Sequence, residues 1–194
     1  MKINHQTIGL VLIGSLSISL SIGSKSLARF YYPPASIFSP TANVHRGSRI
    51  DPIQWLEDNE AKIFAFLLSI GSFESQLNES PTIVTLFVPL DEAFTQLPID
   101  IRERLSEPGA IEKLLKYHLF AGIISETDIK NRQIITLEGN AVKITGKGLA
   151  DGTVETKLNE ATVKASIGLN DNLVLIVIDK VLLPPELKHQ EETN

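Results

Sequence analysis

The stretch Thr82–Phe94, with the sequence TIVTLFVPLDEAF, decides the fold. Residues 82–88 are rich in β-branched and aromatic side chains, and they predict a buried strand that Pro89 ends. Asp91 follows at the position of a helix cap, where a carboxylate accepts hydrogen bonds from the unpaired N–H groups of the first turn. Asp91 and Glu92 also form a pair of carboxylates, as in acid–base catalysis, but a cap explains their position after the proline and catalysis does not. The stretch therefore predicts a strand that leads directly into a helix.

A further helix is predicted on the N-terminal side of this stretch. Asp51 is a capping carboxylate, and Pro52 occupies the first helical position. Apolar residues then recur at helical spacing as far as Ile70. Gly71 is expected to end this helix in a left-handed conformation.

On the C-terminal side the apolar pattern changes from helical to alternating. Pro108 precedes a predicted helix whose apolar face carries Ile111, Leu114, Leu115 and His118. Beyond residue 130 the apolar period becomes two, which predicts strands over 133–137, 141–145, 153–158 and 161–167. The continuous apolar run Leu173–Ile178 predicts a last strand that is covered on both faces. Helices followed by an antiparallel meander give an α+β layout.

Four ordered segments of the chain resemble the fasciclin-like domain family. The longest are TLFVPLDEAF at 85–94, followed by Leu97-Pro98, and LIVIDKVLLP at 175–184, which is similar to the closing strand of the family. Between them lie Leu115–His118, similar to the Tyr-His element of the family, and Thr136–Asn140, similar to its Thr-Leu-x-Gly hairpin. The chain departs from the family where Asn170–Leu173 replaces a common Asn-Gly, and where Leu175 or Ile176 stands in place of a histidine.

The resemblance covers about residues 51–187 and implies a wedge of twisted antiparallel β-sheets packed with several α-helices. The segments around Phe87 and Ile178 are accordingly expected to be neighbouring strands of one sheet. The resemblance also implies an extracellular role in adhesion or matrix association without chemistry of its own. No catalytic residue, cofactor or metal is therefore expected.

Residues 1–28 have the order of a secretory signal peptide. Lys2 gives a positive start, an apolar run covers residues 8–22, and Ser26-Leu27-Ala28 places small residues at the positions that a signal peptidase recognises. Cleavage after Ala28 is favoured over retention as a membrane anchor, because the apolar run is shorter than the ~20 residues that a spanning helix needs. The remaining chain is predicted to comprise a Pro-rich linker or arm (29–50), a single domain (51–187) and a polar tail (188–194).

The composition restricts the classes of function. Lys and Arg number 18 against 23 Asp and Glu, a net charge of −5 that argues against a nucleic-acid partner. The absence of cysteine excludes disulfides, thiol nucleophiles and cysteine-ligated metals. The histidines after the signal, at positions 45, 118 and 189, are too scattered to form a local metal-binding motif. Most phenylalanines of the domain lie in or beside apolar elements and are expected in the core: Phe64, Phe66, Phe73, Phe87, Phe94 and Phe120.

Tyr117 and His118 are the candidate interaction residues. In one interpretation, which follows the resemblance, they belong to a surface segment that makes adhesive contacts. In the other, the Tyr117 ring packs in the interior, and His118 bonds to the backbone at the helix end and ties the helix to the sheet. The position of the histidine on an apolar helical stripe favours the structural interpretation.

Three hypotheses from different functional classes follow. The leading one is a secreted or periplasmic, non-enzymatic module that mediates adhesion by contacting a cell-surface protein or polysaccharide, with no stable membrane span after signal cleavage. The alternative is a carrier of a small apolar ligand in a cleft between sheet and helices, suggested by the many Ile, Leu and Phe residues. An exported hydrolase is the third, and the sequence lacks a Gly-x-Ser-x-Gly nucleophile motif for it.

Overall fold

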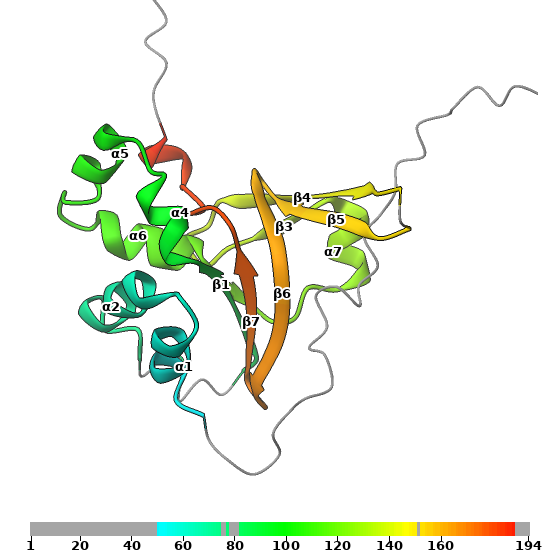
Figure 1. Ribbon diagram of the computed structural model, residues 1–194, viewed down its shortest axis with the longest axis horizontal. Coiled ribbons are helices and arrows are strands. Elements are labelled where there is room, and N and C mark those ends of the chain that lie inside the picture. Colours follow the sequence, from blue (N-terminus) through cyan, green and yellow to red (C-terminus); the bar gives the residue numbers. More distant parts are fainter. Residues whose placement is uncertain (1–49, 75–76, 78–81, 151, 189–194) are drawn as a thin grey trace, which may run out of the picture.

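A seven-stranded sheet with helices packed against it forms the fold in the computed structural model, which describes residues 50–74, 77, 82–150 and 152–188 (Figure 1). This mixed architecture confirms the predicted α+β class. The proposed signal peptide 1–28, nearly all of the 29–50 segment and most of the polar tail lie outside the described residues.

The strands follow the order β2-β1-β7-β6-β5-β4-β3 across the sheet. Their bounds are β1 Val84–Pro89, β2 Leu119–Ala121, β3 Gln133–Ile135, β4 Ala141–Gly148, β5 Val154–Leu158, β6 Ala161–Asn170 and β7 Leu173–Ile178. β1 and β7 are neighbours, with Phe87 paired to Ile176 and Pro89 to Ile178, as the sequence predicted. This pair runs parallel, in contrast to the antiparallel sheets that were expected, whereas the other paired strands run antiparallel. A parallel pair needs a long connection, and residues 90–172, which include β2 to β6, lie between β1 and β7.

The sheet curls so that its two ends approach each other. The backbone N–H of Leu137, just after β3, donates to the carbonyl of Leu119 in β2 at 2.8 Å. The N–H of Glu138 donates to the carbonyl of Lys116 at 3.2 Å. The first bond joins the opposite ends of the strand order and satisfies a carbonyl that the edge strand β2 would otherwise expose, and the second bond links the same segment to α6.

The helices gather mainly beside β1 and β7, while α7 lies beside the β3–β5 end (Figure 1). Their bounds are α1 Pro52–Asp58, α2 Lys62–Ile70, α4 Asp91–Thr95, α5 Ile99–Arg104, α6 Ala110–Tyr117 and α7 Glu126–Asn131, followed by the 3₁₀ turn η2 Pro185–Leu187. Asp51 caps α1 as predicted, by accepting from the N–H groups of Ile53 and Gln54. The single helix expected over 51–70 is in fact two, because the chain breaks at Asn59–Ala61, where Glu60 has a φ of 61°.

Gly71 ends α2, but not in the predicted left-handed conformation. Its φ is −78°, and the left-handed residue is the following Ser72. A Cβ atom at position 71 would lie 2.6 Å from Cδ1 of Leu115 in α6. Glycine is therefore needed here for the close approach of two helices rather than for its φ angle.

Two hydrophobic cores lie on opposite faces of the β1–β7 pair. Leu86, Val88 and Leu175 face the first core, which they share with α1, α2, α4, α5 and α6. Phe87 and Ile176 face the second core, which the curled strands, α7 and the C-terminal segment enclose. Alternate residues thus enter different cores, which is why every residue of β7 is buried, as the apolar run predicted.

Candidate functional site

Tyr117, the last residue of α6, points its side chain into the second core and is 1% exposed. Its hydroxyl donates to the carbonyl of Ala141 at 2.9 Å and accepts from Nδ2 of Asn159 at 3.1 Å. Burial raises the pKa of the phenol, although the Asn159 bond acts in the opposite direction. The tyrosine therefore connects α6 with β4 and with the β5–β6 turn.

His118 caps the C-terminus of α6 and is fully buried. Its Nδ1 lies 2.8 Å from the carbonyl of Leu114, and its Nε2 accepts the N–H of Leu182 at 3.0 Å. Because a carbonyl can only accept, Nδ1 carries the proton and the imidazole is neutral. Burial lowers the pKa of His118 to about 4, against the opposing effect of the Leu114 carbonyl.

The main chain of His118 adds to these connections, since its carbonyl accepts the N–H of Phe87 in β1 at 2.8 Å. The histidine thus joins α6, β1 and the segment after β7. Both ring nitrogens of His118 and the hydroxyl of Tyr117 are occupied inside the domain. The Tyr117 ring packs in the interior and His118 ties the helix end to neighbouring segments, as the second interpretation describes.

An apolar surface lies on α2, where Ile63, Phe66 and Ile70 share one face of the helix and are 37%, 63% and 51% exposed. We call these three residues the α2 face. Phe66 was expected in the core, but the opposite side of α2 already supplies Phe64, Ala65 and Leu68 to it. Seven of the nine residues of α2 are apolar, more than one buried face can hold, and this excess is the sequence signal for the exposed surface.

A shallow groove of about 330 Å³ continues from the α2 face toward α4 and α5. Its lining is mostly apolar: Ile63, Leu67, Phe94, Thr95, Leu97, Arg102 and Leu105. Contiguous exposed apolar surface of this kind is typical of interaction sites.

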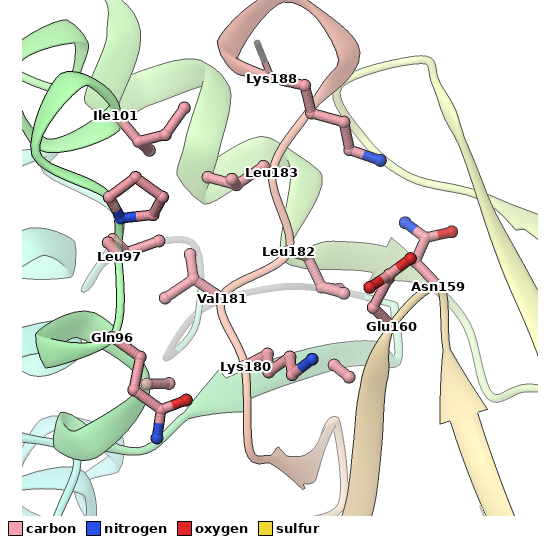
Figure 2. Close-up of a pocket in the computed structure, with 13 residues that line it drawn as sticks. Gln96, Leu97, Ile101, Asn159, Glu160, Lys180, Val181, Leu182, Leu183 and Lys188 are labelled. Carbon is pink, nitrogen blue, oxygen red and sulfur yellow. The ribbon is translucent and has the colours of Figure 1, made fainter.

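A second groove, of about 500 Å³, lies between α4 and α5 on one side and the β5–β6 turn with the segment after β7 on the other (Figure 2). Apolar residues form its floor, among them Leu97, Ile101, Val181, Leu182 and Leu183, and Gln96, Asn159, Glu160, Lys180 and Lys188 provide its polar groups. We call this site the lysine groove. Its residues come from three separate parts of the chain, so no local sequence motif could reveal it. It lies at one end of the sheet, whereas the first core fills the space between the sheet and the helices.

The carboxylates of Asp91 and Glu92 both accept hydrogen bonds within the helical layer. The carboxylate of Asp91 accepts the N–H of Ile63 at 2.8 Å, and Glu92 accepts from Gln96 at 3.3 Å. Asp91 is therefore a cap, but it caps α2 rather than the helix that it begins.

Within the part of the chain that the structure describes, no group of three or more acidic or histidine side chains is placed to hold a metal ion. No helix among those residues has the length and apolar character needed to cross a bilayer.

Comparison with known proteins identifies similar sequences. A family model, the Fasciclin domain, matches residues 59–184. "Protein sll1483" of Synechocystis sp. (strain ATCC 27184 / PCC 6803 / Kazusa) is 36% identical over 104 residues, which cover 52% of this chain and 55% of that protein. Periostin of Homo sapiens is 35% identical over 106 residues, which cover 54% of this chain and 12% of periostin. The matched region thus spans about half of the Synechocystis protein and a small part of periostin.

Among solved structures, a FAS1 domain pair from the insect cell adhesion molecule fasciclin I is similar, with a TM-score of 0.49 and 18% sequence identity. The similarity covers 71% of this chain and 52% of that chain.

Proposed function

Because this chain belongs to the fasciclin domain family, which is associated with adhesion and interaction, we propose that it is an exported, non-enzymatic module that binds a cell-surface protein. The family match over residues 59–184 is the observation that carries the proposal. Contact between surfaces, rather than a reaction, is then the basis of its activity.

The α2 face is the surface that we assign to this contact. Its three large apolar side chains are exposed on one helix, and the apolar groove beside them extends the surface. Apolar side chains at the centre of a patch are typical of protein–protein interfaces. A polysaccharide would find few hydrogen-bonding groups on this face, so a protein partner is favoured.

Export rests on the signal-like sequence of residues 1–28. The test is the intact mass of the protein recovered from the producing organism. Cleavage after Ala28 predicts the mass of residues 29–194 in an extracytoplasmic fraction. The uncleaved chain found only in the cytoplasm would contradict this part of the proposal.

Binding is tested by the retention of the tagged protein on envelope fractions of the producing organism. We expect Phe66→Ser to reduce retention, because it removes the most exposed apolar side chain of the α2 face. Ile99→Ser is the matched control, since Ile99 is 69% exposed on α5 and lines neither groove. Its retention should equal that of the wild type.

Treatment of the envelope before binding identifies the class of partner. Loss of retention after protease digestion supports a protein. Retention that survives protease but is lost after periodate oxidation identifies a polysaccharide and overturns the assignment of the partner. Absence of retention on every envelope fraction would overturn the adhesive function itself.

A further inference from the structure

We propose that the lysine groove binds a single-chain amphiphile with one carboxylate, such as a medium-chain fatty acid. The carboxylate would lie between Lys180 and Lys188, and the hydrocarbon chain would cover the apolar floor. This site lies apart from the α2 face, so the inference goes beyond the proposed adhesive function.

The floor of the groove provides the apolar part of the site. Leu97, Ile101 and Leu182 are held in place by burial, since each is less than 10% exposed, and Leu183 is partly exposed beside them. The groove volume of about 500 Å³ falls in the range of about 300–1,000 Å³ that is usual for small-molecule sites. A hydrocarbon chain on this floor would remove apolar surface from water on both sides of the contact.

The two lysines provide the charge that selects an anion. Lys180 and Lys188 are exposed at the rim, and Figure 2 shows both ammonium groups on the side of the groove where Asn159 and Glu160 lie. Neither forms an ion pair within the part of the chain that the structure describes. The nearby carboxylate of Asp179 does not neutralise Lys180, because it accepts the N–H of Thr162 at 2.6 Å and pairs with Lys164 at 3.0 Å.

The backbone near Lys188 is also fixed by a cation. Arg104 of α5 donates from its guanidinium to the carbonyl of Lys188 at 3.1 Å. This bond ties α5 to the segment after β7, which lie on opposite sides of the groove. The bond fixes the backbone at Lys188, and Lys180 and Lys188 place two cationic side chains at the rim of the groove in a protein whose net charge is −5.

Glu160 limits the charge of the ligand. Its carboxylate shares the rim with the two lysines, so the three side chains together carry one positive charge. The amide of Asn159 is uncharged and held in place, because its Oδ1 accepts the backbone N–H of Lys143 and its Nδ2 donates to the hydroxyl of Tyr117. One positive charge above an apolar floor is complementary to a monoanion with an apolar chain, rather than to a polyanion or a cation.

The probe for this site is decanoate, titrated into the full protein by calorimetry below its micelle concentration. We expect saturable binding to one site, weakened by added salt because the lysines are exposed. Decyltrimethylammonium has the same chain and the opposite charge, and it should not bind in the same concentration range. Equal binding of both probes, or no saturable binding of decanoate, would overturn the proposal.

Charge-removing variants locate the ligand. Lys180→Met and Lys188→Met keep an apolar stem, and each should weaken decanoate binding about two- to fivefold, the range expected for an exposed ion pair. Glu160→Gln removes the repelling carboxylate and should strengthen binding by a similar factor. Lys130→Met on α7 is the matched control, because that lysine pairs only with Glu126 at 3.7 Å among the described interactions.

The folded state of each variant is checked by circular dichroism and thermal unfolding. All four positions are exposed, so the melting curves should match the wild type. Unchanged affinity in both groove lysine variants, with folding intact, would show that decanoate binds elsewhere and would overturn the site. Envelope retention measured on the same variants separates this result from the adhesive function, which does not involve the groove.

Discussion

The carboxylate of Asp91 accepts a hydrogen bond from the backbone N–H of Ile63, 28 residues earlier in the chain, at 2.8 Å. The N–H of Asp91 in turn donates to the carbonyl of Glu60 at 2.7 Å. The first residue of α4 thus satisfies an unpaired N–H of α2 and fixes the break between α1 and α2. This connection holds α2, the helix that carries the α2 face, beside the end of β1.

Asp91→Ala should lower the free energy of unfolding by about 1 kcal/mol, because the first turn of α2 loses its only described side-chain cap. Asp91→Asn keeps an acceptor oxygen and should cost less. Chemical denaturation of both variants measures the difference. Glu92→Ala is the neighbouring control, and a loss there as large as in Asp91→Ala would contradict the capping role.

The stability of the domain should fall on acidification because of His118. The unfolded chain protonates this histidine near its ordinary pKa of 6.5, whereas the pKa in the folded domain is about 4. Between these values the unfolded state binds more protons, so the free energy of unfolding decreases as pH falls, by up to about 1.4 kcal/mol per pH unit and about 3 kcal/mol in all. The physical cause is that a proton on Nε2 would break the bond from Leu182 and charge a buried ring.

Urea unfolding of the wild type and of His118→Ala at pH 7, 6 and 5 tests this expectation. The variant should be less stable at pH 7 and should lack the part of the pH dependence that the histidine contributes. Parallel pH dependences for the two proteins would show that His118 does not titrate in this window. If His118→Ala keeps wild-type stability but loses envelope retention, the interaction role would replace the structural one.

Two phenylalanines of the helices, one buried and one exposed, should respond differently to truncation. Phe94→Ala should destabilise the domain by about 3–5 kcal/mol, because its ring is 7% exposed and packs 6.4 Å from the ring of Phe64. Phe66→Ala should change stability by less than about 0.5 kcal/mol, since the ring is exposed. Denaturation midpoints measure both values, and a large loss for Phe66→Ala would mean that the α2 face is packed in solution.

Gly71→Ala should destabilise the domain by about 1–3 kcal/mol, the usual cost of overpacking, because the added methyl would meet Leu115. The φ of −78° itself permits alanine. Combining Gly71→Ala with Leu115→Ala should therefore cost less than the sum of the single variants, by at least about 0.5 kcal/mol. Strictly additive losses would show that the clash is not with Leu115.

The sequence predicted which segments form helices and strands better than it predicted which distant residues bond to one another. The buried strand of residues 82–88, the Asp51-Pro52 helix start and the pairing of the segments around Phe87 and Ile178 follow from local patterns and from the family resemblance. The capping character of Asp91 was also evident, but the helix that it caps was not. A cap requires only an acceptor near unpaired N–H groups, and residues distant in sequence can supply it.

The α2 face and the lysine groove also differ in how far the sequence could predict them. An excess of apolar residues in Lys62–Ile70 was visible in the sequence, yet which of them face solvent depends on the side of α2 that packs on the first core. The lysine groove was not visible at all. Lys180, Glu160 and Gln96 belong to separate segments, and only the fold brings them to one rim.

The sequence by itself determined that the chain forms strands and helices in an α+β order and that a buried strand closes the domain. Those properties depend on hydrophobic periodicity and on caps, which act over a few neighbouring residues. The tertiary structure decided that β1 and β7 run parallel, that Asp91 caps α2, and that three distant segments form the lysine groove. These outcomes depend on packing between distant segments, which local sequence patterns do not encode.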